Sequence, residues 1–79
     1  MSKESYRKRL IDLRTAIANE REAKKRDNAR YASLIKGASS ASTKAFYRKS
    51  KIDCAASHDR RIADWKRQVE TTRSAMRSA

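Results

Sequence analysis

Two side chains capable of metal or nucleophilic chemistry, Cys54 and His58, stand four residues apart in this chain. On a helix this spacing projects both to the same side, so a zinc or thiol site is one interpretation. Zinc needs three or four protein ligands, and with one cysteine and one histidine a closed site would need a pair from each of two chains. Catalysis by a Cys54 nucleophile and a His58 base would need an oxyanion pocket and a water-excluded cleft, which a helix surface does not provide. The favoured interpretation is a buried thiol and a histidine satisfied by Glu20 or Asp27, with no catalytic residue, metal ligand or cofactor.

Positive charge is the stronger chemical signal. The chain has 21 lysines and arginines against nine acidic residues, so 12 positive charges lack an acidic counterpart. Basic side chains follow the apolar positions in a pattern that suits a phosphate backbone, and the candidate contacts are Lys3, Arg7, Arg14, Arg21, Lys25, Lys66, Arg73 and Arg77. Such residues also keep helices soluble, but the excess indicates an anionic partner. No helix-turn-helix, finger or basic-region pattern is present, so any nucleic-acid binding is expected to be sequence-independent.

A tract of small residues in the stretch LIKGASSASTKAFYRKSK, residues 34–51, precedes an aromatic pair and a basic cluster. It has two interpretations, a turn between helices and a docking site. Tyr47 could stack on an unpaired base, as aromatic side chains among basic residues do in single-strand binders, although an aromatic residue at helical spacing is more often part of a core.

The spacing of apolar residues along the whole chain predicts two helices, and these helices carry the residues described above. Apolar residues at helical spacing run from Tyr6 to Ile35 and again from Tyr47 to Met76. The first helix is predicted over about 4–36, with a serine cap near Ser2 to Ser5 and a stop at Gly37 in a left-handed conformation. The turn is predicted over about 37–43, and the second helix over about 44–77 after one of several serine and threonine caps.

This arrangement predicts an all-α, antiparallel two-helix hairpin that resembles a coiled coil and forms a single unit over 1–79. Facing residues should have numbers that add to about 82. A polar layer containing Glu20, Lys24 and Asp27 should then face the region of Ala55, His58 and Ile62 and fix the register. One long helix through the serines is the alternative. The predicted association face comprises Tyr6, Leu10, Leu13, Ile17, Tyr31, Ile35, Ile62, Trp65 and Val69.

The apolar content is low for a chain that folds alone. Thirteen of its 30 apolar residues are alanine, and Leu, Ile, Val and Phe together number ten of 79. A lone hairpin would therefore be marginally stable, so completion by self-association into a helical bundle is expected.

Nothing in the sequence indicates export or membrane insertion. The amino-terminal residues lack the apolar run of a secretory signal, and no stretch is long enough to cross a bilayer. The lone cysteine cannot form an intrachain disulfide, so we expect a cytoplasmic protein.

The residues SSAST, then YRK after three intervening residues, then a helix containing HDRRIADW, form a pattern that resembles a short coiled-coil segment of some bacterial effector proteins. Such segments precede Toll/interleukin-receptor-like or other immunity domains. The similarity covers Arg7 to Glu70, but this chain contains no effector domain and lacks an extended KKIA run. The resemblance implies an adaptor without chemistry of its own in a bacterial defence or stress system. It also implies a recognition turn formed by Ser39, Ser40, Ser42, Thr43, Tyr47 and Arg48.

Together these observations predict a non-enzymatic helical assembly or adaptor module that self-associates and docks a protein partner. The alternative is a sequence-independent nucleic-acid-binding protein that uses its basic helix faces.

Overall fold

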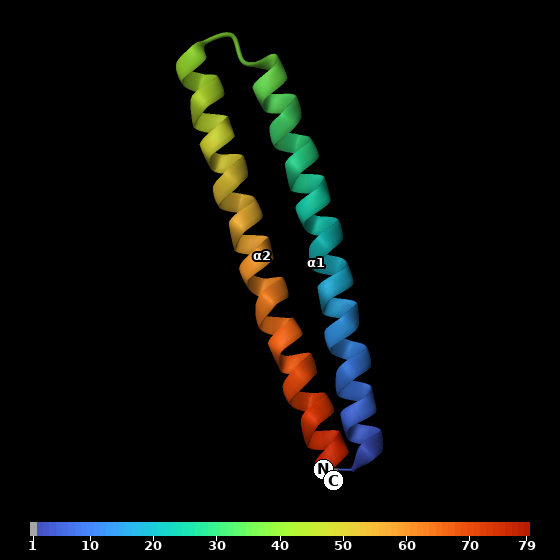
Figure 1. Cartoon of the computed structure of the whole chain (residues 1–79). Helices are drawn as coiled ribbons and strands as arrows, with labels where there is room; N and C mark the ends of the chain where they lie inside the picture. Colours follow the sequence, from blue (N-terminus) through green and yellow to red (C-terminus); the bar gives the residue numbers. More distant parts are fainter. Residues whose placement is uncertain (1) are drawn as a thin grey trace.

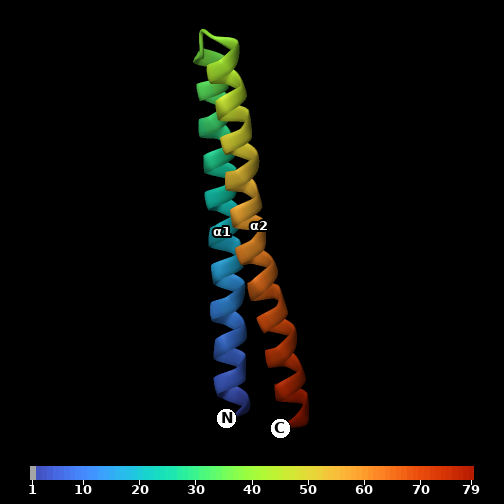
Figure 2. The same ribbon diagram turned by 90° about the vertical axis from the view of Figure 1, so that its left-hand side faces the viewer.

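The computed structural model describes residues 2–79, which form two long antiparallel helices joined by a short turn (Figure 1). Helix α1 spans Lys3–Gly37 and helix α2 spans Ala41–Ser78, and no strand occurs among these residues. The start of α1 and the end of α2 lie at the end of the molecule opposite the turn (Figures 1 and 2). The predicted all-α hairpin is confirmed, and the alternative of one continuous helix is wrong.

Serine side chains begin both helices. Ser2 Oγ accepts a hydrogen bond from the backbone N–H of Ser5, and Ser40 Oγ accepts one from Thr43 at 3.1 Å. Each bond satisfies a backbone donor that has no partner within its own helix. Ser40 is therefore the cap of α2, and this helix begins three residues before the predicted start at about residue 44.

The end of α1 differs from the prediction at Gly37. No described residue has a left-handed backbone conformation, and Gly37 belongs to the last turn of the helix. The chain leaves the helix at Ala38, which is extended at φ −73° and ψ 137° and donates its N–H to Ile35. The reversal therefore needs an extended residue and a serine cap, and it does not depend on glycine.

A narrow core lies between the helices. Its buried apolar residues are Leu10, Leu13 and Ile17 of α1 and Ile62 of α2. The other members of the predicted association face are half-buried, namely Tyr6, Tyr31, Ile35, Trp65 and Val69. The face is therefore turned toward the partner helix of the same chain and only partly shielded from water.

The register agrees closely with the prediction. Polar contacts across the helices join residues whose numbers add to between 77 and 85, and Glu20 with Arg61 and Asp27 with Cys54 both give 81. The resulting rod measures 59 × 14 × 11 Å and has a radius of gyration of 17.9 Å. A compact domain of this length would have a radius of about 12 Å, so the hairpin is strongly elongated. Within residues 2–79, neither helix carries an apolar stretch suited to crossing a bilayer.

Candidate functional site

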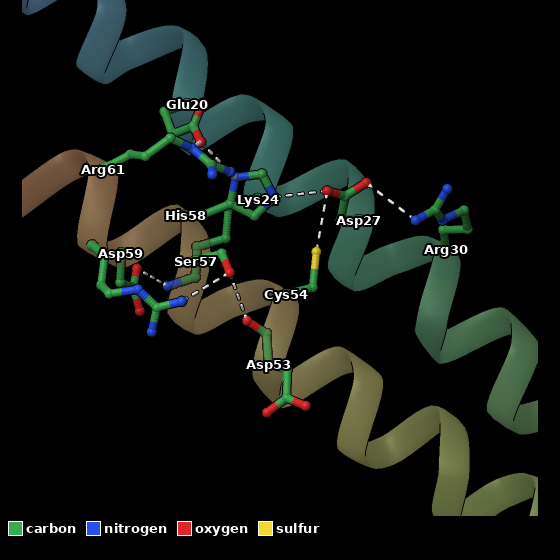
Figure 3. Close-up of polar contacts among 11 residues, drawn as sticks. Glu20, Lys24, Asp27, Arg30, Asp53, Cys54, Ser57, His58, Asp59 and Arg61 are labelled. Atoms are coloured by element: carbon green, nitrogen blue, oxygen red, sulfur yellow. Dashed lines mark hydrogen bonds and ion pairs between the residues drawn. The ribbon is translucent and has the colours of Figure 1, made fainter.

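A layer of polar side chains interrupts the apolar core midway along the hairpin, with His58 at its centre (Figure 3). His58 is only 6% exposed. Its Nδ1 lies 2.9 Å from Oε1 of Glu20, and its Nε2 lies 2.7 Å from Oδ2 of Asp27. Glu20 and Asp27 are seven residues apart on α1, about two helical turns, so one imidazole on α2 can bridge them. The predicted pairing of the histidine with Glu20 or Asp27 is confirmed, and both carboxylates take part.

Neighbouring charged side chains extend this layer. The guanidinium of Arg61 pairs with Glu20, and Arg30 approaches Asp27 at 3.7 Å. Lys24, the third predicted member, reaches across the hairpin to Asp59 at 2.8 Å. The polar layer is therefore defined by His58, Glu20, Asp27, Cys54, Arg61, Lys24 and Asp59.

The hydrogen bonds shift the ionisation of the three central groups. Bonds to Asp27 and then Glu20 raise the pKa of His58 above its ordinary value, which favours the imidazolium. Hydrogen bonds from Arg61 and His58 lower the pKa of Glu20, and bonds from His58 and Cys54 lower the pKa of Asp27. A protonated imidazole donates from both nitrogens, so one cation joins two anions of the opposite helix.

Cys54 lies one helical turn before His58 and points at the same carboxylate. Its thiol donates to Oδ2 of Asp27 at 3.4 Å (Figure 3). Burial, followed by the hydrogen bond to Asp27, raises the pKa of the Cys54 thiol, so the uncharged form is favoured. The thiolate is the nucleophilic form of cysteine, so the raised pKa leaves Cys54 with less thiolate at neutral pH than an ordinary exposed cysteine has.

The structure separates the predicted recognition turn into two parts. Ser40 Oγ contacts the hydroxyls of both Ser42 and Thr43, so these side chains take part in capping α2. Ser39, Thr43 and Tyr47 line one hollow beside the turn. Arg48 lines a different groove together with Ile35 and Ile52.

The predicted phosphate contacts lie on the surface of the rod. All eight are exposed. Within residues 2–79, Arg73 alone among these eight forms an ion pair, with Glu70 at 3.3 Å. Across all 21 basic residues, six pair with an acidic side chain in the described part of the chain, and fifteen remain available to an anionic partner.

Two features of the hairpin were not predicted from the sequence. Thr72 is 5% exposed and donates its hydroxyl to the carbonyl of Gln68. The gap between Val69 and Met76 in the apolar pattern indicates a core position near 72, so helical spacing could have found it. The bond from Cys54 to Asp27 could not be found in this way, because it depends on the exact rotation of both helices.

The chain matches no protein-family model, no curated protein and no solved structure.

Proposed function

We propose that this chain is a non-enzymatic helical assembly module that self-associates and docks a partner protein. One observation carries the proposal. The hairpin buries four large apolar side chains but leaves Ile11, Phe46 and Ile52 at 62%, 66% and 69% exposure. A two-helix hairpin has no second layer to cover such residues, and packing against another copy would supply one.

The accessible surface supports the same proposal. The chain exposes 5768 Å². A compact monomer of 9.1 kDa would expose about 4,900 Å². The excess reflects the open sides of the rod, which a four-helix bundle would partly cover.

Partner docking is assigned to a turn-end patch made of Leu34, Phe46 and Tyr47. The rings of Phe46 and Tyr47 meet edge to face with their centroids 5.8 Å apart. Leu34 and Tyr47 line the same hollow, beside Ser39 and Thr43. Phe46 is 66% exposed and Tyr47 is half-buried, and aromatic side chains at the surface beside hydroxyl groups are typical of protein contact surfaces.

The test is the molar mass of the full chain, measured by light scattering or sedimentation over a range of protein concentrations. Self-association predicts a mass that rises with concentration above the 9.1 kDa of one chain. Phe46→Ser and Ile52→Ser should weaken assembly, whereas Lys49→Ser, which removes an exposed polar side chain of the same helix, should not. A mass of one chain at every concentration would overturn the proposal.

Sequence-independent nucleic-acid binding is the second candidate, favoured by the fifteen basic side chains without an acidic partner. A protein that contacts six to ten phosphates loses about 10³- to 10⁵-fold in affinity between about 50 and 200 mM salt. Binding to a labelled duplex and a labelled single strand should therefore be compared at these two salt concentrations. No binding at the lower concentration would eliminate this candidate.

The proposed setting is the bacterial cytoplasm, in a defence or stress system, as the resemblance to effector-linked coiled coils implies. Cys54 as a free thiol is compatible with a reducing compartment.

A further inference from the structure

Three different metal-binding atoms meet on one side of the polar layer. Sγ of Cys54, Nε2 of His58 and Oδ2 of Asp27 come from two helices, and the donor atoms of these residues lie within 4.8 Å of one another. From this arrangement we propose that Cys54, His58 and Asp27 of a single chain bind a divalent transition-metal ion of the zinc type. The two-chain site considered from the sequence is unnecessary, because α1 supplies the third ligand.

Both donor pairs that include Asp27 lie close to the spacing that zinc requires, and the Cys54 and His58 donors, within 4.8 Å of one another, would have to draw together around the ion. Ligand bonds of about 2.3 Å to sulfur and 2.0–2.1 Å to nitrogen or oxygen place tetrahedral donor atoms roughly 3.3–3.6 Å apart. The Cys54 sulfur and Asp27 oxygen already lie 3.4 Å apart. The Asp27 oxygen and His58 Nε2 lie 2.7 Å apart and would separate by less than about 1 Å, which side-chain rotation can supply.

The surroundings of His58 fit a metal ligand. On the far side of the ring Nδ1 lies 2.9 Å from Glu20 Oε1 and 3.2 Å from Nη2 of Arg61. Because the nearer carboxylate can only accept, a neutral imidazole that keeps this bond has its proton on Nδ1 and its lone pair on Nε2, facing Asp27 (Figure 3). A carboxylate in this position orients a metal-bound histidine and strengthens it as a ligand. Arg61 holds Glu20 in turn. A fourth position remains for water, as in zinc sites with three protein ligands.

The proton balance is defined. In the metal-free hairpin the thiol carries one proton, and the imidazole carries one or two according to the pH. A bound ion replaces the proton on Sγ and any proton on Nε2, so one proton leaves for each metal ion when His58 is neutral and two leave when it is charged. The Nδ1 proton stays in its hydrogen bond to Glu20.

Cobalt(II) is the probe for this site, because a thiolate ligand gives it a sulfur-to-metal charge-transfer absorption in the near ultraviolet. The full chain, reduced and freed of metal, should be titrated with Co²⁺ and then with Zn²⁺. We expect one Co²⁺ per chain, the thiolate band, loss of that band on addition of Zn²⁺, and the release of at least one proton per ion in a weakly buffered solution.

Variants distinguish the site from loose surface binding. Cys54→Ser should abolish the charge-transfer band. Asp27→Asn should weaken Co²⁺ binding by more than tenfold, and Glu20→Gln by about 10- to 100-fold. The matched control is Asp53→Asn, whose carboxylate lies outside the cluster (Figure 3). Circular dichroism should show retained helicity before each titration.

Three outcomes would overturn the proposal. The first is a Co²⁺ spectrum of the unaltered chain without the thiolate band, which is decisive even where a variant fails to fold. The second is a stoichiometry of one ion per two chains, which would place the site between copies. The third is equal affinity in Asp27→Asn and Asp53→Asn.

Discussion

At the scale of single residues, the charge of His58 is coupled to the stability of the hairpin. The imidazolium bridges Glu20 and Asp27, while Arg61 and the Cys54 thiol contact the same two carboxylates. Neutralising either partner removes a charge-assisted hydrogen bond from a half-buried layer. This coupling predicts a pH dependence for the metal-free chain.

The pH dependence follows from the directions of the pKa shifts. The pKa of His58 is raised above 6.5, so its stabilising contribution is fully present below pH 6.5 and is lost as pH rises through the raised value. The carboxyls of Glu20 and Asp27 have pKa values below 4.5 and 3.8, so their contributions are present above these values and are lost as pH falls. The free energy of unfolding should therefore be largest between about pH 4.5 and 6.5, as measured by urea denaturation with a chelator at fixed protein concentration.

His58→Gln is the control for this prediction. Glutamine retains hydrogen-bonding capacity but does not titrate, so the loss of stability above pH 6.5 should disappear while the loss at low pH remains. If the free energy of unfolding fell equally steeply with pH above 6.5 in both proteins, the pH dependence could not be assigned to His58.

At the scale of the elements, the cap of α2 gives the next prediction. Ser40→Ala removes the acceptor for the N–H of Thr43 and should lower the free energy of unfolding by about 1 kcal/mol. Ser39→Ala is the matched control, because Ser39 is exposed and its side chain forms no hydrogen bond within residues 2–79. Thermal or urea unfolding, monitored by circular dichroism, measures the free energy of unfolding of both variants. An equal loss in the two variants would show that Ser40 does not act as the cap.

Gly37 gives a prediction of opposite sign. Its backbone is helical, and a Cβ at this position would meet no atom within 4 Å. Gly37→Ala should therefore stabilise the hairpin by about 0.4–1 kcal/mol, because alanine loses less backbone entropy on folding. If the glycine instead formed the left-handed cap expected from the sequence, the same change would destabilise the chain. Unfolding curves of the two proteins decide between these signs.

The sequence predicted the fold well, because the helical spacing of apolar residues and the serine caps act locally. It also predicted the polar layer, since the register follows from the position of the turn. The prediction of a left-handed Gly37 was wrong, because the chain leaves α1 through an extended Ala38 and needs no glycine to reverse its direction. The contacts of Cys54 and Arg61 with α1 were missed. Which side chain of α2 reaches a given residue of α1 depends on how each helix is rotated about its axis, and the sequence pattern does not define that rotation.

At the scale of the whole molecule, the shallow core makes large side chains unequal in importance. Trp65 is half-buried on the inner side of α2, whereas Ile11 is 62% exposed. Trp65→Ala should destabilise the chain by up to about 3 kcal/mol, the lower end of the range for a buried tryptophan. Ile11→Ala should change stability by less than about 0.5 kcal/mol in the monomer. Urea unfolding at low protein concentration measures both, and equal effects would place Trp65 outside the core.

Net charge gives the last prediction, because it opposes assembly and favours phosphate binding. Each copy carries +12 on a rod only 11–14 Å thick, so neighbouring copies in a bundle lie near or within the Debye length of about 10 Å at 0.1 M salt. Added salt should therefore strengthen self-association, measured as molar mass by light scattering, and should weaken binding to a labelled nucleic acid, measured by fluorescence anisotropy. Sodium chloride is the appropriate salt, since sulfate would also strengthen apolar contacts. Phe46→Ser should weaken assembly at every salt concentration and leave the salt dependence of nucleic-acid binding unchanged. A molar mass that falls as salt rises would show that ion pairs, rather than the exposed apolar residues, hold the copies together.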